Sequence, residues 1–505
     1  MQTNILEYLE NIVSKCPEKT AFSNGEQGLC FRELFEQSRA VGSFLTSRGF
    51  SREPVVVFMD KHPSEIAAFF GVVYSGSFYV PIDEEMPLHR IELIFSVLKP
   101  RAAICDEKSA ENISKMNYGG EIFCYNNICG TPVDENALAT VRGKQIDTDP
   151  VYTVFTSGST GLPKGVVACH RSVIDYIENL SETLEFGPET VFGNQAPLYV
   201  DACLKEMLPT LKFGATTFMI PKQLFAFPLK LIEFLNLHKI NTVCWVASAL
   251  SLVSGLGALK KAVPSHLRTI AFGSEVFPVK QLNAWREALP EAKFTNLYGP
   301  TEATGMSCYF KVEREFAPDE IIPIGRSFKN TEILLLDGDK PVTGTGDVGE
   351  ICIRGTAVTL GYYANPEKTS EAFTQNPLNT AYPEVIYRTG DLGKLNKNGE
   401  LVFVSRKDYQ IKHMGYRIEL GEIEAAANMM QGVQSVCCMF DEVNKKIVMC
   451  YTGDVTPPEV SAYLKGKLPR YMQPNSLFPR EAMPLTSNGK IDRVSLKNQY
   501  CQEVK

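Results

Sequence analysis

A ten-residue loop, 156–165, gathers the side chains best suited to phosphate chemistry. It follows an apolar, β-branched run at 151–155, which predicts a buried strand. Its sequence is Thr156-Ser157-Gly158-Ser159-Thr160-Gly161-Leu162-Pro163-Lys164-Gly165. Hydroxyls, backbone N–H groups and one ammonium can all be aimed at a single anion there. The spacing is not that of a P-loop, because Gly165 rather than Ser or Thr follows Lys164. The loop therefore predicts a phosphate-binding site, with a flexible Ser/Gly surface loop as the alternative.

Three further stretches carry groups that suit a nucleotide. Tyr298-Gly299-Pro300-Thr301-Glu302 offers a flat aromatic ring for a purine and a carboxylate for Mg²⁺; the alternative is a plain Gly-Pro turn. Thr389-Gly390-Asp391 places an acid after a glycine turn, where acids often bind ribose hydroxyls, although such turns are common. Asn488-Gly489-Lys490 presents one lysine at the tip of a turn.

Size and composition indicate a globular enzyme of more than one domain. The chain has 505 residues, of which 44% are hydrophobic and 22% charged. Its first residues lack the basic and apolar segments of a secretory signal, so none is expected. A net charge of -7 without a basic run argues against a nucleic-acid partner. The longest uncharged stretch, 240–259, is expected to be a core strand and helix rather than a membrane span. Fourteen scattered cysteines without a C-x-x-C pair are typical of a cytoplasmic protein.

The order of elements predicts an α/β fold. Strand and helix patterns alternate through 1–150 and again through 150–310, which favours two doubly wound βα subdomains. Short strands with turns follow and predict a small antiparallel or barrel-like piece. Near Asp408 a charged joint leads into about a hundred residues of mixed helix and strand, which suits a small α+β domain on a hinge. We therefore expect a core at 1–407 and a mobile lid at 408–505.

The motifs occur in the order found in the adenylate-forming enzymes, and the chain resembles that superfamily over essentially its whole length. The stretches 156–165, 298–302, 387–391, 406–424 and 484–493 carry the resemblance. Asn194-Gln195-Ala196-Pro197 and Gly273-Ser274-Glu275-Val276-Phe277-Pro278 look most like free-standing D-alanine–carrier protein ligases, which are similar to peptide-synthetase adenylation domains.

The resemblance implies a role for each matching residue. Lys490, Glu302 and Thr301 would be catalytic, Glu302 would hold Mg²⁺, and Asp408 would be the hinge. The residues implied to bind ATP are Thr156, Ser157, Gly158, Ser159, Thr160, Lys164, Asn296, Tyr298, Gly299, Asp391, Arg406 and Lys490. Glu419, Glu422 and Glu424, which follow the hinge, are expected to form an exposed charged face.

An amino-acid substrate is implied by Asp201, because the amino-acid-activating branch pairs the substrate ammonium with an acid at this position. The alternative is that Asp201 is the N-cap of a helix beginning near Ala202. The implied substrate-binding residues are Asp201, Ala202, Lys205, Trp245, Ile270, Phe272, Gly273, Leu297, Gly305 and Met306. The large Trp245 and Phe272 favour a small substrate such as alanine. Lys205 favours an acidic one, unless its ammonium reaches solvent or pairs with Glu206.

The expected reaction has two steps. The chain would attach AMP to an amino acid with release of pyrophosphate, and then pass the aminoacyl group to a phosphopantetheine thiol. Since no carrier domain follows residue 505, we expect the carrier to be a separate protein. The alternatives are an acyl- or aryl-CoA ligase of the same fold and a nucleotide-binding protein without catalysis.

Overall fold

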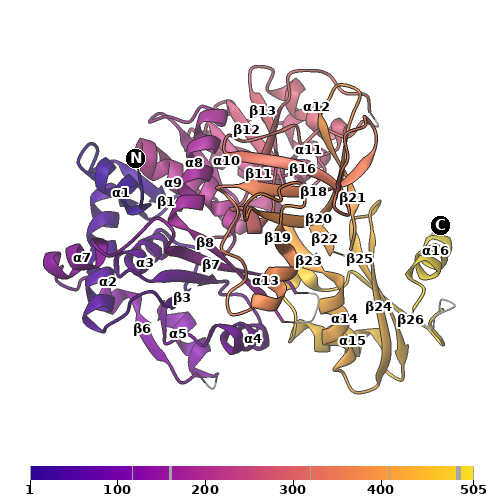
Figure 1. Ribbon diagram of the computed structural model, residues 1–505, viewed down its shortest axis with the longest axis horizontal. Coiled ribbons are helices and arrows are strands. Elements are labelled where there is room, and N and C mark those ends of the chain that lie inside the picture. Colours follow the sequence, from indigo (N-terminus) through magenta and orange to yellow (C-terminus); the bar gives the residue numbers. More distant parts are fainter. Residues whose placement is uncertain are drawn as a thin grey trace. The chain divides into compact units, whose positions relative to one another are not determined.

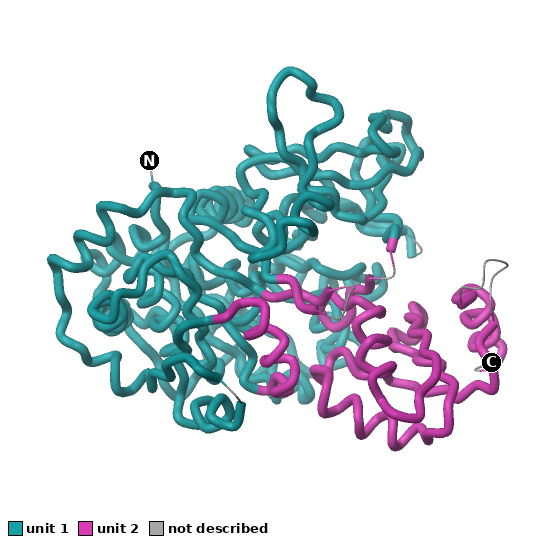
Figure 2. The backbone as a smooth tube through the Cα atoms, turned by 60° about the horizontal axis from the view of Figure 1, so that its bottom comes forward, with its two compact units in different colours: residues 1–84, 100–154, 165–407 teal, residues 85–99, 155–164, 408–505 magenta. Residues whose placement is uncertain are grey.

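The computed structural model describes residues 2–116, 118–158, 162–318, 320–408, 410–484 and 491–503. The chain forms two compact units (Figure 2). The larger comprises 1–84, 100–154 and 165–407, and the smaller comprises 85–99, 155–164 and 408–505. The second unit thus combines the carboxy-terminal part of the chain with two short segments from much earlier in the sequence.

A nine-stranded sheet forms the centre of the larger unit (Figure 1). Its strands between β1 and β13 pair in parallel, and its outer pairs are antiparallel. In spatial order the strands are β15 (Arg326–Ser327), β14 (Cys308–Lys311), β13 (Lys293–Tyr298), β12 (Thr269–Gly273), β11 (Thr242–Val246), β9 (Val191–Asn194), β10 (Thr216–Met219), β1 (Thr20–Ser23) and β2 (Gly28–Cys30).

A six-stranded sheet with parallel pairs from β6 to β7 confirms the second expected βα subdomain. Its strands in spatial order are β6 (Glu121–Cys124), β5 (Ala102–Cys105), β3 (Pro54–Phe58), β4 (Phe78–Ile82), β7 (Pro150–Thr156) and β8 (Lys164–Cys169). Central strands such as β3 and β4 are buried along their whole length, which is why they appear in the sequence as continuous apolar runs.

Helices connect the strands of these two sheets. The helices of the larger unit are α1 (Leu6–Val13), α2 (Phe31–Ser47), α3 (Pro63–Tyr74), α5 (Glu107–Ser114), α6 (Tyr125–Ile128), α7 (Glu135–Arg142), α8 (His170–Leu184), α9 (Leu204–Phe213), α10 (Pro228–Leu237), α11 (Ala247–Gly255), α12 (Val279–Ala288) and α13 (Pro366–Ala372). The expected strand and helix of the uncharged stretch are β11 and α11. None of the helices described in either unit is long and apolar enough to cross a bilayer.

The third sheet is antiparallel, as expected for the region after residue 310. Its strands are β17 (Lys340–Pro341), β16 (Thr331–Asp337), β18 (Val348–Gly355), β20 (Val385–Leu395) and β19 (Phe373–Gln375), and β21 (Leu401–Arg406) pairs with β20. Together with the two βα sheets, it confirms the α/β class of the larger unit.

The smaller unit mixes helices with two small sheets. Its elements are α4 (Leu88–Leu98), β22 (Gln410–His413), β23 (Tyr416–Glu419), α14 (Leu420–Asn428), β24 (Val433–Asp441), β25 (Lys446–Gly453), α15 (Pro457–Lys465), β26 (Ser476–Pro479) and α16 (Arg493–Glu503). The core of this unit includes Ile418, Ile423, Met449 and Val460.

Two hydrophobic clusters of the larger unit lie on opposite faces of β11 and β12. Along these strands successive side chains alternate between the faces, and Cys244 pairs with Ala271 while Trp245 pairs with Phe272. Cys244 and Ala271 belong to the first cluster, together with Leu204 of α9. Trp245 and Phe272 belong to the second cluster. A shift of one residue in an alignment therefore exchanges one environment for the other.

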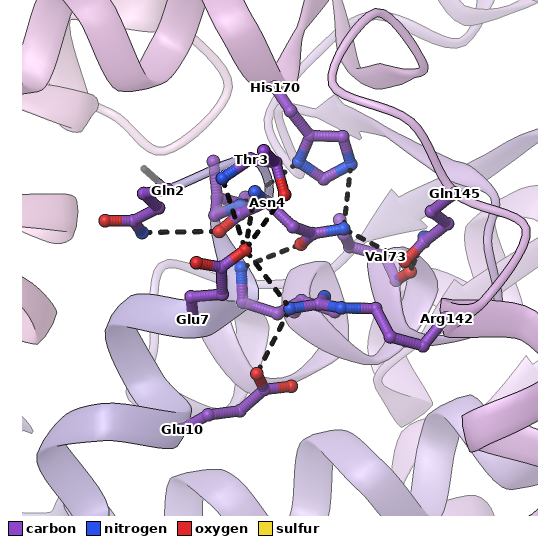
Figure 3. A network of polar contacts seen from close by, with 11 residues as sticks. Gln2, Thr3, Asn4, Glu7, Glu10, Val73, Arg142, Gln145 and His170 are labelled. Atoms are coloured by element: carbon purple, nitrogen blue, oxygen red, sulfur yellow. Dashed lines mark hydrogen bonds and ion pairs between the residues drawn. The ribbon is translucent and has the colours of Figure 1, made fainter.

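A buried polar network ties the amino-terminal segment to the larger unit (Figure 3). The Nδ1 atom of His170 accepts a hydrogen bond from the backbone N–H of Ile5 at 3.2 Å. The side chain of Asn4 donates to Oε1 of Gln145 at 3.0 Å, and Arg142 pairs with Glu10 at 3.1 Å. His170 is 1% exposed, and burial lowers its pKa to about 3, with the nearby charge of Arg142 as a second cause.

This network predicts acid sensitivity. The pKa of His170 is lower in the folded chain than the value of 6.5 expected in the unfolded chain, so below pH 6.5 only the unfolded chain takes up the proton. The unfolding free energy should therefore fall as the pH is lowered, by about 1.4 kcal/mol per pH unit from this group. Urea denaturation followed by the fluorescence of Trp245 and Trp285, both in the larger unit, measures this slope. His170→Asn, which keeps an acceptor, should reduce the slope between pH 4 and 6; equal slopes would contradict the assignment.

Candidate functional site

The predicted site residues fall in both units, and each group is described within its own unit. In the larger unit, the end of β13 leads into the turn 298–302. The hydroxyl of Tyr298 donates to Oδ2 of Asp391 at 2.6 Å, and Arg406 forms an ion pair with the same carboxylate. Asp391 is 2% exposed and Tyr298 5% exposed. The structure thus joins three residues implied to bind ATP, from β13, β20 and β21, around one buried acid.

Glu302 lies in a short 3₁₀ turn, η4 (Thr301–Ala303), and is fully buried. Its Oε1 atom accepts a hydrogen bond from the hydroxyl of Tyr362 at 2.8 Å, and its carbonyl oxygen accepts one from the N–H of Thr359 at 3.0 Å. No group of three or more metal-binding side chains occurs in the described chain. A single held carboxylate nevertheless fits Mg²⁺, which binds proteins through one or two carboxylates and otherwise uses phosphates and water.

Glycine is required at two of the predicted positions. A Cβ atom on Gly299 would come within 2.5 Å of the carbonyl oxygen of Gly305, and one on Gly273 would come within 2.3 Å of the carbonyl oxygen of Leu297. Gly305 itself has a φ of +94°, which is the left-handed region that glycine tolerates. These close approaches bring β12, β13 and the turn after η4 together. Asn296, on β13, donates its side-chain amide to the carbonyl of Pro323 at 2.8 Å.

Asp201 begins the 3₁₀ turn η1 (Asp201–Cys203) and does not cap a helix. Helix α9 starts only at Leu204, its N-cap is Cys203, and neither turn nor helix has a side-chain cap. The capping alternative is therefore wrong, because the chain makes an extra 3₁₀ turn before α9. Burial raises the pKa of Asp201, while a hydrogen bond with Thr301 and the charge of Lys205 act in the opposite direction. Asp201 and Thr301 are thus neighbours in the structure.

Lys205 and Glu206 follow on the first turn of α9, and both are buried. Lys205 is 2% exposed and Glu206 is not exposed at all. The expectation that the ammonium of Lys205 reaches solvent is wrong, because α9 is covered on this side. Within the described residues Lys205 makes no ion pair and no hydrogen bond, so pairing with Glu206 is also not observed. Its charge still acts on Asp201, Glu206 and the thiol of Cys244.

The structure does not bring all the implied pocket residues together. Trp245, Ile270 and Phe272 lie in the second cluster, where the indole of Trp245 stacks edge-on against Phe225 and donates to the carbonyl of Gly193 at 2.7 Å. Ala202, Leu297 and Met306 lie in or against the first cluster. On the strands, the residues that share the face of the first cluster are Cys244 and Ala271, each adjacent in sequence to a predicted residue. Period-2 alternation then places Gly273 on this face as well.

Several polar residues beside Asp201 and Glu206 have no motif in the sequence that would identify them. The hydroxyls of Tyr152 and Tyr176 are buried without a partner, and the charges of Asp201 and Cys203 act on both. Lys61 donates to the carbonyls of Asn194 and Gln195, each at 3.4 Å. Burial lowers its pKa to about 8, although Glu206 opposes the shift. These residues come from β7, α8 and the segment just before α3, so only the fold brings them together.

In the smaller unit, the predicted phosphate loop contacts the segment 417–422. Ser157 donates its hydroxyl to the carbonyl of Arg417 at 2.8 Å and accepts from the N–H of Glu419 at 3.1 Å. The N–H of Gly158 donates to Oε2 of Glu422 at 3.2 Å, and Lys164 pairs with Glu419 at 3.7 Å. The loop therefore holds anionic groups, here two carboxylates of its own chain.

The expected exposed charged face at 419–424 is wrong. Glu419 and Glu422 are 6% and 3% exposed, because Lys164 and Arg90 neutralise them. Glu424 pairs with Arg493 at 2.7 Å. Each partner is distant in sequence, so local charge alone could not reveal this burial.

The remaining predicted residues of the smaller unit are less informative. Thr156 donates its hydroxyl to the carbonyl of Lys164 at 3.5 Å. Asp408, the expected hinge, accepts from the N–H of Gln410 at 3.2 Å, and the chain passes from the larger unit to the smaller one between Lys407 and Asp408. Ser159, Thr160 and Lys490 lie outside the described residues.

Comparisons with known proteins agree with these features. The AMP-binding enzyme family model matches residues 9–363. Tyrocidine synthase 2 of Brevibacillus parabrevis is 30% identical over 520 residues, which cover 98% of this chain but 14% of that protein. The chain spans only 8% to 14% of the first three curated relatives it matches.

Solved structures share the fold. NpsA-ThdA, an artificially fused adenylation-PCP di-domain from Klebsiella oxytoca, superimposes with a TM-score of 0.81 at 20% identity over 94% of this chain and 93% of that one. o-Succinylbenzoate CoA synthetase (MenE) from Bacillus subtilis superimposes with a TM-score of 0.83 at 19% identity, covering 98% of both chains. At these identities the likeness is one of fold alone.

Proposed function

Because the chain belongs to the AMP-binding enzymes, we propose that it activates a free amino acid as its aminoacyl-AMP and then transfers the aminoacyl group to a phosphopantetheine thiol on a carrier protein. The carrier is a separate chain in this proposal. Adenylate formation is the reaction of the family, whereas the amino acid and the carrier are specific to the proposal.

The observation that carries the amino-acid assignment is the environment of Asp201. It is an acid in a short turn beside Thr301, and it has no capping role that would explain it. An acid whose surroundings disfavour its charge gains most from a cationic ligand, and the α-ammonium of an amino acid is such a ligand. A plain fatty or aryl acid would leave Asp201 without this partner.

The first step requires stabilisation of negative charge. The substrate carboxylate attacks the α-phosphorus of ATP, and pyrophosphate leaves, so charge accumulates on the phosphate oxygens. In this proposal Lys490 faces the α-phosphate and the attacking carboxylate, and the 156–164 loop with Lys164 holds the outer phosphates. Asp391, already oriented by Tyr298 and Arg406, accepts hydrogen bonds from the ribose. Mg²⁺ at Glu302 would neutralise further charge.

The second step needs only access of a thiol to the acyl carbon. The thiol sulfur forms a thioester bond as the acyl–phosphate bond breaks, and AMP leaves. We propose that the lid turns about Asp408 between the steps, so that Lys490 serves only the first.

ATP–pyrophosphate exchange across free acids tests the proposal. Exchange with one amino acid and none with benzoate, the amine-free control, is the expected result. Subsequent transfer of that amino acid to a phosphopantetheine-bearing carrier protein, and not to free coenzyme A, tests the acceptor. Exchange only with amine-free acids, or transfer to coenzyme A, would assign the chain to the CoA ligases, whose fold it also shares. ATP binding without exchange would indicate a nucleotide-binding protein without catalysis.

A further inference from the structure

Lys205 is a buried cation without a partner among the described residues. Its side chain comes from the first turn of α9, and only 2% of the residue is exposed. Removing an ammonium from water is costly unless an anion or several acceptors replace the water. An anionic ligand that pairs with Lys205 would offset this cost.

Two other polar groups near Lys205 lack a hydrogen-bond partner. The hydroxyls of Tyr152 and Tyr176 have no hydrogen-bond partner, and each tyrosine is at least 98% buried. Tyr176 shares with Lys205 the neighbours Asp201, Glu206 and Cys244. An ammonium has three donors and no acceptor, so a ligand that pairs with Lys205 must supply acceptors, and a carboxylate supplies more acceptor sites than any neutral side chain.

The charges around Lys205 point in the same direction. The proposed function places the substrate ammonium against Asp201, so Asp201 is then neutralised. What remains is two ammonium groups, Lys205 and Lys61, facing two carboxyls, Glu206 and Glu65. Burial disfavours the charge of both acids, because it raises the pKa of Glu65 well above its usual value and that of Glu206 to about 7.

We propose that the substrate is an amino acid with a carboxylate side chain and that Lys205 binds that carboxylate. This inference rests on the proposed function and specifies its substrate class. Asp201 binds the α-ammonium, the α-carboxylate goes to the phosphorus, and the side-chain carboxylate pairs with the ammonium of Lys205.

Small residues lie on the face of the sheet that Lys205 shares. The large Trp245 and Phe272, which favoured a substrate as small as alanine, lie on the opposite face of the sheet in the second cluster. On the face shared with Lys205, β11 and β12 present Cys244, Ala271 and Gly273 instead. Small residues at these positions remove the argument from size against an acidic amino acid.

The rival assignment is a basic side chain held by Glu206. Oε1 of Glu206 and Oδ1 of Asn194 both lack a hydrogen-bond partner among the described residues. Glu206 already accepts from Asn194 through Oε2 at 3.3 Å, and the charges of both Lys205 and Lys61 act on it. A third ammonium would be repelled by those two lysines, so we favour the acidic side chain.

The experiment is ATP–pyrophosphate exchange on the full chain with aspartate, glutamate, asparagine, glutamine, alanine, ornithine and benzoate. We expect kcat/KM for one acidic amino acid to exceed that for its own amide by on the order of 10²–10³-fold, since the amide leaves a buried charge unpaired. A higher value for alanine, an amide or ornithine would overturn the inference and leave the proposed function standing. Exchange with benzoate alone would overturn both, whereas exchange with none of these acids would overturn the inference and leave the proposed function to be tested with the remaining amino acids.

Two variants separate recognition from folding. Lys205→Gln should lower kcat/KM for the acidic substrate by a similar factor and reduce the acid-to-amide ratio to about one or below, while Lys205→Arg keeps a cation and should retain the acid preference. Lys212→Gln is the matched control, because Lys212 lies on the same helix but pairs with Glu178 near the surface. An acid-to-amide ratio unchanged in Lys205→Gln would overturn the inference. If that variant does not fold, the wild-type panel alone decides.

Discussion

Lys490→Ala is expected to slow aminoacyl-AMP formation by about 10²–10³-fold while leaving thioester formation from preformed aminoacyl-AMP largely intact. A cation that contacts the α-phosphate stabilises the charge that develops there, and loss of one such group costs about 10²–10³ in rate. The thiol step breaks the acyl–phosphate bond with AMP as a good leaving group, and the proposal gives Lys490 no part in it.

Two assays measure this division. ATP–pyrophosphate exchange reports the first step, and transfer from chemically synthesised aminoacyl-AMP to the carrier protein reports the second. Lys497→Ala is the control, because Lys497 is half exposed on α16 and, among the residues that the structure describes, pairs with Glu442 alone, at 3.6 Å. Equal loss of both steps in Lys490→Ala would refute the assignment.

Arg90→Met should be the most destabilising single change in the smaller unit. Arg90 and Glu422 form an ion pair in which each side chain is 4% exposed. Removing one partner leaves the other charge buried, which typically costs about 3–5 kcal/mol. Hydrogen exchange of the amides in α14 measures the loss, because Glu422 lies on that helix.

The double variant Arg90→Met/Glu422→Gln distinguishes a charge effect from a packing effect. It removes both charges, and the glutamine can still accept from the N–H of Gly158. We expect it to recover much of the loss, since removing a whole buried pair is often nearly neutral. Arg480→Met, which breaks the more exposed pair with Glu503, should cost about 1 kcal/mol or less. A double variant as unstable as Arg90→Met would show that shape, not charge, holds this contact.

Local sequence predicted most of the fold but not the faces of its strands. The strand predicted at 151–155 is β7, the uncharged stretch 240–259 contains the expected strand and helix, and the order of motifs identified the family. Trp245 and Cys244 are neighbours in that stretch, yet they face different cores, and a one-residue shift in alignment exchanges them. Motif spacing does not show which face of the sheet each residue of a strand occupies, whereas the pairing of β11 with β12 does.

The sequence also did not predict which charged residues are buried. Glu422 looks like part of a charged surface because its neighbours in the chain are charged, but its partner Arg90 comes from a segment more than 300 residues earlier. Lys205 next to Glu206 looks like a self-contained pair, but the fold buries both and keeps their charged atoms beyond ion-pair distance. The sequence shows which residues are acidic or basic, but only the fold shows which of them form ion pairs.

The carboxylate of Glu422 on the N–H of Gly158 changes what a nucleotide affinity would mean in this chain. A phosphate that takes this N–H replaces an anion that is already there, so binding is an exchange and the measured free energy is a difference between two anions. Whatever strengthens the hold of Glu422 on the loop weakens nucleotide binding by the same amount, and bound nucleotide weakens that hold in return. The stability of the smaller unit and the affinity for ATP would then be coupled, because both depend on whether Glu422 or a phosphate accepts from the N–H of Gly158.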